Sequence, residues 1–176
     1  MTSSTRDDDA AQQRMGRFAP KEDPHGIYDR FIQSHALDFK TALREINEGE
    51  KQGCWIWFML PTSPYVVNGE ERGSEMNRLY ALRGDNAVAA FLTFETVDGV
   101  NLRKNYIGLL KAIRRQQQMG NTLRWMFGSV DDSKAISSFQ LFERVGRDMG
   151  DEELYNLCRQ VLDLCAKERS SQHDIQ

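Results

Sequence analysis

The stretch from residue 100 to residue 119, VNLRKNYIGLLKAIRRQQQM, decides the fold class of this chain. Its apolar residues recur three or four positions apart, as they do along one face of an α-helix. Charged and amide side chains fill most positions between them, so the stretch predicts an amphipathic helix that packs its apolar stripe on a core. The apolar set consists of Leu102, Tyr106, Leu109, Leu110 and Ile113.

Two further helical patterns lie upstream, between Ile27 and Gly49. Their apolar residues form two sets at helical spacing, which predict two short amphipathic helices broken near Ala36 and Leu37. Asp38 stands where a helix N-cap is expected, because its carboxylate can accept a hydrogen bond from an unpaired backbone N–H. Gly49 stands where the chain leaves the helix, since glycine adopts the left-handed conformation without strain.

The remaining patterned segments are also helical. Residues 61–73 are rich in turn formers and predict a surface loop, in which residues 66–69 suit a small hairpin. Because no other strand signal is left, the sequence predicts an all-α fold, a compact multihelical single domain of about seven to eight short helices. The other predicted helices begin at Ser74 and at Asp85, or run roughly from Asp131 to Arg147 and from Asp151 to Arg169.

Length and composition bound the domain organisation. A chain of 176 residues with 40% hydrophobic side chains is long enough for one sizeable core and too short for two ordinary domains. Residues 1–26 are polar and lack apolar periodicity, so they predict a disordered N-terminal tail. We expect a single helical domain over residues 27–169 and a flexible C-terminal tail over residues 170–176.

Charge, hydropathy and cysteine content exclude several function classes. The formal net charge of −3 gives no global field that selects nucleic acid or a membrane surface. No window approaches the roughly 18 apolar residues of a spanning helix, and the start of the chain lacks the apolar core of a secretory signal. Three cysteines, an odd number, do not form a disulfide framework. We therefore expect a cytoplasmic protein with reduced thiols and no membrane association.

Signatures of metal and cofactor binding are missing from the sequence. The three histidines, His25, His35 and His173, are too scattered to suggest a ligand set. Phosphate-cradling loops, dinucleotide fingerprints and serine nucleophile elbows are also missing. The sequence therefore predicts neither a metal site nor a cofactor.

The most aromatic stretch of the chain is GCWIWFMLP, residues 53–61, which places Trp55 and Trp57 two positions apart. Rigid aromatic surface of this density is typical of a core or of a pocket wall. One interpretation places Trp55 in the core and leaves Trp57 partly buried with its N–H hydrogen bonded. The alternative is that Trp57 stacks on a planar ligand, with Tyr80 and Phe127 nearby.

A second dense block, FGSVDDSKAISSFQLF over residues 127–142, carries carboxylates, an amine and hydroxyls at the start of a predicted helix. The structural interpretation is that Ser129 caps this helix with Asp132 as its partner, and that the acids suit the positive end of the helix dipole. The alternative is a small polar site, in which adjacent aspartates favour a polar or cationic ligand group over a phosphate. Its residues would be Asp131, Asp132, Lys134, Ser137 and Ser138.

Three motifs carry a family resemblance: Trp-x-Trp-Phe-x-x-Pro, then Ser-x-x-x-x-x-Tyr-Ala over residues 74–81, then Phe-Gly-Ser-x-Asp-Asp-x-Lys-x-x-Ser-Ser-x-x-Leu-Phe. In this order they resemble bacterial and protist proteins grouped as a domain of unknown function and often mislabelled calpastatin-like, over about Tyr28 to Leu164. The resemblance implies a compact multihelical domain used inside the cell, without an established activity. It also implies a histidine and a glutamine where this chain has Cys54 and Thr62, so an activity that needs the histidine would be altered here.

The segment between Gly99 and Val130 contains no acidic residue and is the most basic part of the chain. Such a stretch is able to contact RNA phosphates or an acidic partner. It also suits a solvated helix face that balances acidic neighbouring helices, so nucleic acid ranks behind a small molecule or a protein as a partner. The basic residues are Arg103, Lys104, Lys111, Arg114, Arg115 and Arg124, with Tyr106 and Trp125 among them.

These observations leave three functional hypotheses. The first is a ligand- or partner-binding helical module with its site near the Trp block and the polar block. The second is a small enzyme acting on a nucleotide-like or other planar metabolite, with Cys54 as a further candidate residue. The third is RNA binding through residues 103–124. No catalytic residue is identified, and the candidate ligand-binding set is Trp55, Trp57, Tyr80, Phe127, Asp131, Asp132, Lys134, Ser137 and Ser138.

Overall fold

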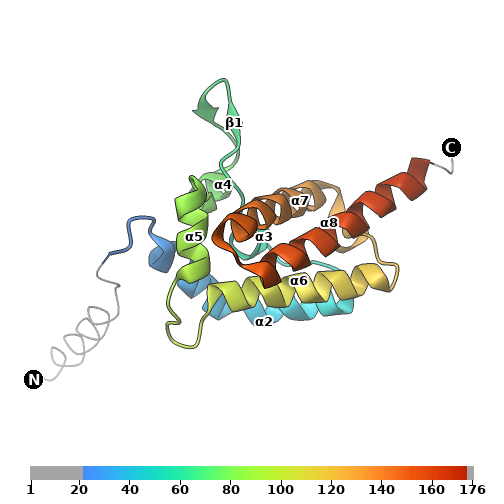
Figure 1. Ribbon diagram of the computed structural model, residues 1–176, viewed down its shortest axis with the longest axis horizontal. Helices are drawn as coiled ribbons and strands as arrows, with labels where there is room; N and C mark the ends of the chain where they lie inside the picture. Colours follow the sequence, from blue (N-terminus) through green and yellow to red (C-terminus); the bar gives the residue numbers. More distant parts are fainter. Residues whose placement is uncertain (1–21, 174–176) are drawn as a thin grey trace, which may run out of the picture.

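A computed structural model describes residues 22–173 of the chain (Figure 1). Within them the chain forms seven α-helices, one π-helical turn and one two-stranded hairpin, which confirms the predicted all-α class. The predicted N-terminal tail lies largely outside the described residues, whereas residues 170–173 of the predicted C-terminal tail are described and belong to the last helix. The elements are η1 (Tyr28–Ile32), α2 (Gln33–Glu48), α3 (Ile56–Met59), β1 (Val66–Val67), β2 (Glu70–Glu71), α4 (Glu75–Tyr80), α5 (Asp85–Thr93), α6 (Leu102–Gln118), α7 (Leu123–Met149) and α8 (Glu152–His173).

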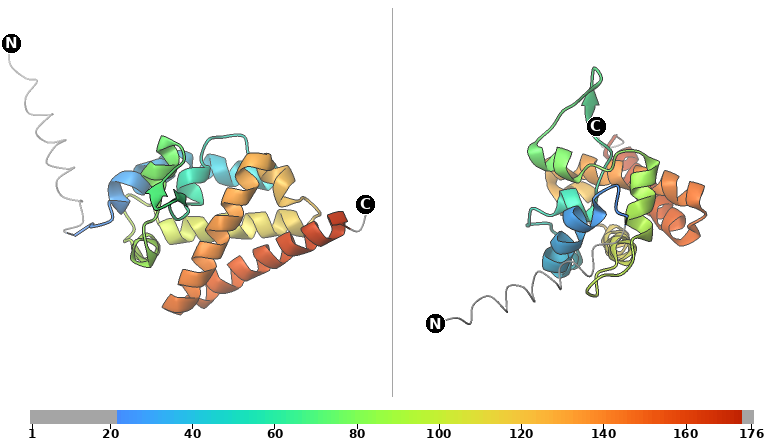
Figure 2. Two further views of the ribbon diagram at one scale, coloured as in Figure 1. Left: turned by 90° about the horizontal axis from the view of Figure 1, so that it is seen from above. Right: turned by 90° about the vertical axis from the view of Figure 1, so that its left-hand side faces the viewer.

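Helix α6 stands at the centre of the fold, as its amphipathic pattern predicts. It packs against α2 and against α8, and α8 packs in turn on α7 (Figures 1 and 2). Its apolar stripe is buried, with Leu109, Leu110 and Ile113 completely covered. Helix α5 lies across one end of this bundle and contacts both α6 and α7. None of the helices in the described range is both long and apolar enough to cross a membrane.

Aromatic rings join the helices around α7. Phe91 of α5 meets Phe31 of η1 at 5.1 Å between ring centroids and Phe142 of α7 at 5.6 Å, both nearly edge-on. Tyr106 of α6 stacks on Phe142 at 4.0 Å, and its hydroxyl lies 3.0 Å from the Ser138 hydroxyl. These contacts fix the second half of α7, which carries the polar block of the sequence.

The predicted break near Ala36 and Leu37 is wrong, because helical backbone runs without interruption from η1 into α2. Leu37 is 72% exposed on the outer face of α2, so its apolar side chain does not belong to a core stripe. Asp38 therefore lies inside the helix and not at an N-cap. The predicted helix end is confirmed, since Gly49 has a φ of 94° and its N–H donates to two carbonyls of the last turn.

Helix α7 begins at Leu123, well before the predicted start at Asp131. The hydroxyl of Thr122 caps it by accepting a hydrogen bond from a backbone N–H of the first turn. A kink follows at Gly128, whose φ of 77° interrupts the helical backbone. The predicted cap at Ser129 is not formed, because within the described residues its hydroxyl bonds no backbone N–H of the helix.

The segment between α3 and α4 contains the predicted hairpin. Strands β1 and β2 pair antiparallel, with Val66 opposite Glu71, and the hairpin projects from the helical body (Figures 1 and 2). The Glu71 carboxylate ties it back by accepting two hydrogen bonds from the Arg83 guanidinium, each 2.7 Å long. Helix α4 then begins after Ser74, whose hydroxyl caps it as the sequence predicts.

Candidate functional site

Trp55 belongs to the core, as one interpretation of the Trp block expects. Its side chain is only 2% exposed, and its indole N–H donates a 2.7 Å hydrogen bond to Glu45 Oε2. The same oxygen accepts the backbone N–H groups of Gln52 and Gly53, each at 2.9 Å. A Cβ at position 53 would lie 2.8 Å from Trp55 Cδ1, so a larger residue there would force a rearrangement. The loop that leads into α3 is therefore fixed.

Glu45 is a buried carboxylate that hydrogen bonds keep charged. Burial by itself would raise the pKa of this carboxyl, but the bonds from Gly53, Gln52 and Trp55 outweigh it and leave the pKa below its ordinary value. The ammonium of Lys51 also contacts Trp55, at 5.3 Å from the centroid of its ring. Glu45 therefore holds the loop in place as a fixed anion.

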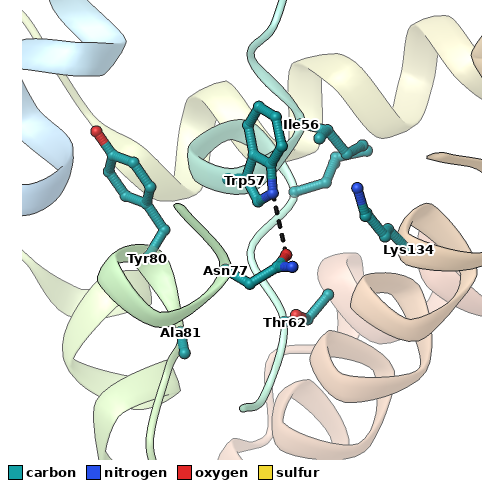
Figure 3. Close-up of a pocket in the computed structure, with 8 residues that line it drawn as sticks. Ile56, Trp57, Thr62, Asn77, Tyr80, Ala81 and Lys134 are labelled. Atoms are coloured by element: carbon teal, nitrogen blue, oxygen red, sulfur yellow. Dashed lines mark hydrogen bonds between the residues drawn. The ribbon is translucent and has the colours of Figure 1, made fainter. Parts of the chain in front are cut away.

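Trp57 lies half-buried and lines a hollow at the surface. Its indole N–H donates a 3.0 Å hydrogen bond to Asn77 Oδ1 of α4 (Figure 3). The Lys134 ammonium of α7 lies 5.0 Å from the Trp57 ring centroid, within the range of a cation–π contact. One indole thus connects three separate segments of the chain.

Asp131 is shared between two lysines. Its Oδ2 lies 2.8 Å from Lys51 Nζ, and its Oδ1 lies 3.0 Å from Lys134 Nζ. Burial favours a higher pKa for the carboxyl, but the hydrogen bonds from both lysines outweigh it and lower the pKa. The three groups carry a net charge of +1. Since the Lys51 side chain is 9% exposed and that of Lys134 is 29% exposed, the positive charge that reaches the surface is that of Lys134.

Two adjoining hollows lie in front of these side chains. The outer one, called the groove below, has a volume of about 420 Å³. The inner one, the niche, has about 10 Å³, which is room for about one water molecule. Thr62, Asn77 and Lys134 line both hollows and mark the junction between them. The groove is also lined by Ser63, Pro64, Tyr65, Ser133 and Ser137, and the niche by Ile56, Trp57, Leu60, Tyr80 and Ala81.

Tyr80 lines the niche from the end of α4. Its hydroxyl lies 3.1 Å from the Ser34 hydroxyl, and its ring packs at 5.2 Å from Phe58 and 5.6 Å from Phe31. The Arg30 guanidinium fixes the same end of α4 by donating to two backbone carbonyls, at 2.8 and 3.1 Å. The position of this wall is therefore set by η1 and α2, which lie far from it in the sequence.

The structure brings together part of the predicted site. Asp131 does not line either hollow, but it holds the Lys134 ammonium from behind. The predicted residues that do line the hollows come from three separate helices, α3, α4 and α7, so tertiary packing brings them together (Figure 3). The predicted residues that line the hollows are Trp57, Tyr80, Lys134 and Ser137.

Four predicted site residues lie elsewhere. Trp55 and Phe127 pack edge-on in the core, with 6.0 Å between their ring centroids. Ser138 is completely buried against the Tyr106 hydroxyl. Asp132 accepts a hydrogen bond from the next backbone N–H and lines a different hollow. A helix turns adjacent side chains about 100° apart, so neighbours in the sequence such as Asp131 and Asp132 face different surroundings.

Four polar residues of the groove were not predicted as site residues: Thr62, Ser63, Asn77 and Ser133. Thr62 carried one signal, since it departs from the pattern of the family that the sequence resembles. Asn77 and Ser133 carried none, because a single polar residue on a helix is most often solvated surface. Only the fold reveals that they line the same groove as Lys134.

His35 is a buried polar residue that the sequence did not place. Its Nε2 donates to the Phe58 carbonyl at 2.8 Å, and its Nδ1 accepts from Asn105 Nδ2 at 3.2 Å. Burial lowers the pKa of the imidazole to about 4, although the bond to Phe58 favours the charged form. The ring is therefore neutral at physiological pH and joins α2 to α3 and α6.

Neither hollow is lined by Cys54, Cys158 or Cys165. Cys54 is exposed and lines neither hollow. Cys158 and Cys165 are buried core residues, and burial raises the pKa of the Cys165 thiol to about 11. Within residues 22–173, no group of three or more His, Cys, Asp or Glu side chains could hold a metal ion.

Two cations of the basic segment form ion pairs with acids at the start of α8. Arg103 donates two 2.7 Å hydrogen bonds to the Asp151 carboxylate, and Lys111 Nζ lies 3.0 Å from Glu153 Oε1. Tyr106 is completely buried, so its ring cannot stack on a nucleic acid base. This arrangement favours a charge-balanced helix face over an RNA-binding surface.

Comparisons with known proteins agree with this fold and assign no activity. A family model described as protein of unknown function (DUF1810) matches residues 26–173. Among solved structures, the crystal structure of the conserved hypothetical protein Rv1873 from Mycobacterium tuberculosis is similar, with a TM-score of 0.65 and 22% sequence identity. The match covers 80% of this chain and 87% of that chain, and at this identity it shows the fold alone. A search of curated proteins found no match.

Proposed function

Because the chain belongs to the DUF1810 family of proteins of unknown function, its role has to be inferred from the site, and we propose that the groove binds a small organic molecule. The family match agrees with the resemblance to an uncharacterised family found in the sequence. The observation that carries the proposal is the junction where Thr62, Asn77 and Lys134 meet at a groove of about 420 Å³. That volume lies within the range of small-molecule sites.

The lining of the groove supports this proposal. Pro64 and Tyr65 offer apolar contact surface, and Tyr65 is 63% exposed, which leaves its ring available for stacking. Asn77 and Lys134 supply polar groups from two helices that other contacts hold in place. A few fixed polar groups within a partly apolar hollow are typical of sites that orient one ligand.

Binding without catalysis is favoured by the positions of the candidate catalytic groups. Both oxygens of Asp131 are engaged by lysines and its pKa is lowered, so it is a poor proton acceptor at neutral pH. Asp132 lines another hollow, and the Cys54 thiol lines neither the groove nor the niche. The groups that an enzyme for a planar metabolite would need are therefore dispersed.

A thermal-melt screen tests the proposal. The purified protein is heated in the presence of a few hundred cellular metabolites, nucleotides included, each in large excess. A ligand at about a hundred times its dissociation constant stabilises the fold by about 2.7 kcal/mol, which raises the Tm of a domain of this size by roughly 5–10 °C. We expect at least one compound to produce a shift of this order.

Substitution of Tyr65 assigns the shift to the groove. Tyr65 is exposed, so Tyr65→Ala should cost little folding stability while it removes the stacking surface. Leu37→Ala on α2 is a matched control, because Leu37 is an exposed apolar residue outside the groove. The proposal is contradicted if no compound raises the Tm, or if the shifts are the same in Tyr65→Ala and in Leu37→Ala.

An extended peptide is a second candidate occupant, favoured by the hairpin beside the groove. Tyr65, Val66 and Val67 are consecutive apolar residues that the fold leaves uncovered. A strand pairing with such an exposed edge gains main-chain hydrogen bonds and side-chain contacts together. Selection from a random peptide library would enrich apolar sequences that bind the wild-type protein and lose affinity for Val66→Asp. Enriched peptides that bind both proteins equally would exclude this occupant.

We keep the cytoplasmic location expected from the sequence as part of the proposal. All three cysteines are free, one exposed and two buried, and free thiols suit a reducing compartment. Fractionation of cells that express the full chain should recover it in the cytosolic fraction. Recovery with membranes or in the medium would contradict this location.

A further inference from the structure

We infer that the ligand of the groove carries an anionic group, a phosphate or a carboxylate, that binds at the junction with the niche. Thr62, Asn77 and Lys134 would hold the oxygens of that group. The inference rests on the proposed function, because it names the chemical class of the ligand for the same groove. Its support comes from the charge, the hydrogen-bonding capacity and the size of the junction.

The charge at the junction is positive. Among the described residues that line the groove or the niche, Lys134 is the one charged side chain. Asp131 does not cancel this charge, because Lys51 occupies its other carboxylate oxygen at 2.8 Å. Two ammonium groups on one carboxylate leave a surplus positive charge on the more exposed lysine. The geometry thus reverses the expectation that adjacent aspartates would select a cationic ligand group.

The junction also has unpaired hydrogen-bond donors. Asn77 uses its Oδ1 to accept the indole N–H of Trp57, so its amide nitrogen points the other way. Within the described residues neither that nitrogen nor the Thr62 hydroxyl has a hydrogen-bond partner. The Lys134 ammonium gives one of its hydrogens to Asp131 and keeps others available. An oxyanion would satisfy all three donors.

Two of the three serines that line the groove, Ser133 and Ser137, have a different hydrogen-bonding capacity. The hydroxyls of Ser133 and Ser137 donate to helix carbonyls, at 3.5 Å to Val130 and 3.0 Å to Ser133. Their lone pairs are what remains for a ligand, so they suit hydroxyl or amine hydrogens. The groove therefore matches a molecule with an anionic group at one end and hydrogen-bond donors along its body.

The size of the two hollows places the anion at the mouth of the niche. The niche holds about one water molecule and excludes a phosphate, whereas the groove has room for a small organic anion. Figure 3 shows Thr62, Asn77 and Lys134, which come from three different segments of the chain: the connection after α3, helix α4 and helix α7. Because these three side chains line both hollows, the anionic oxygens would contact them at this junction.

Inorganic phosphate and acetate are the probes that test the inference. Each is titrated into the full chain, and NMR chemical shifts follow the backbone amides and the Asn77 side-chain amide. We expect saturable shifts confined to residues 62–65, 74–81 and 130–137. Compounds from the metabolite screen are then compared in pairs, each acid with its amide and each phosphate ester with its alcohol. The charged member should bind at least about tenfold more tightly.

Three substitutions of nearly unchanged shape each remove one contact. Asn77→Asp keeps the acceptor for Trp57 but replaces the amide donors with negative charge, Thr62→Val removes the hydroxyl, and Lys134→Met removes the charge. Each should weaken anion binding at least about tenfold. Lys104→Met is the matched control, because Lys104 is an exposed lysine on α6 outside the groove, and it should leave the affinity unchanged.

The outcomes separate this inference from the proposed function. If metabolites bind in a manner that depends on Tyr65 while neutral and charged pair members bind equally, the inference is overturned and the proposed function stands. Phosphate shifts that are identical in the wild type and in Asn77→Asp also overturn it. If neither the probes nor any metabolite bind saturably, both fail. The Tm of each variant without ligand verifies folding, and Asn77→Asp and Thr62→Val carry the test if Lys134→Met is unstable.

Discussion

Trp55 and Trp57 lie two residues apart and each donates its indole N–H to a side-chain oxygen, yet their surroundings differ. The acceptor of Trp55 is Glu45, which also pairs two backbone N–H groups, so this side of α3 is fully satisfied. The acceptor of Trp57 is Asn77, whose amide hydrogens stay unpaired at the edge of the groove. The difference teaches that the candidate site begins where the paired hydrogen-bonding groups of the core give way to unpaired donors at the surface.

The largest expected effect separates the two tryptophans directly. Trp55→Ala should lower the free energy of unfolding by about 4 kcal/mol, because it leaves a cavity and removes a donor from buried Glu45. Trp57→Ala should cost only about 1–2 kcal/mol, since that side chain is partly exposed. Urea unfolding of both variants measures the difference. Equal losses would show that Trp57 is as much a part of the core as Trp55.

Low pH tests the buried hydrogen bonds of α3 through His35, which donates to the Phe58 carbonyl. Its pKa is about 4 in the folded protein and about 6.5 in an unfolded chain, so the unfolded state binds more protons between these values. The contribution of His35 to stability is therefore complete above about pH 6.5 and is lost as the pH falls toward 4, by about 3 kcal/mol. Urea unfolding at steps of pH measures this loss. A His35→Gln variant with the same slope between pH 6.5 and 5 would contradict the assignment.

A smaller effect is expected at the loop that Glu45 holds. Gly53→Ala should lower the free energy of unfolding by about 2 kcal/mol, because its Cβ would press on Trp55. Gly108→Ala in α6 is the matched control, since its Cβ would meet Phe39 at an ordinary 3.5 Å and alanine favours the helix. The Tm should fall by roughly 4–8 °C in the first variant and stay level or rise in the second. Similar Tm values for both variants would mean that the loop around Gly53 rearranges at little cost in stability.

The smallest effect sharpens the comparison at Asp131. Lys51→Met should cost about 1–2 kcal/mol, because that ion pair is nearly covered. Lys134→Met should cost less than about 1 kcal/mol, since the Lys134 side chain is more exposed and solvent screens its charge. Double-mutant cycles with Asp131→Asn isolate each pairing energy. A larger pairing energy of Asp131 with Lys134 than with Lys51 would contradict this prediction.

Much of the fold could be predicted from the sequence because helical periodicity records which face is buried. The stripe of α6, the end of α2 at Gly49 and the cap of α4 at Ser74 all depend on local chemistry. The errors arise where local chemistry is ambiguous. Leu37 is apolar but points outward, and the kink at Gly128 divides α7 into two helical segments, of which the prediction found only the second.

The candidate site could be predicted only in part, because it is assembled by packing between distant segments. Helix α3 is a single turn, so periodicity could not tell which tryptophan faces inward. Thr62 and Asn77 meet Lys134 only in the folded chain. The surroundings of Asp131 depend on Lys51, which lies in a loop that no motif connects with it.

The ion pair between Glu71 and Arg83 has a kinetic consequence for the groove. Residues 62–65 form the outer wall and lead directly into the hairpin that this exposed pair ties to the body. Salt screens exposed ion pairs, so added salt should loosen the wall and shorten the residence time of any bound molecule, whatever its charge. Only an anionic molecule should also arrive more slowly, because salt weakens its attraction to Lys134.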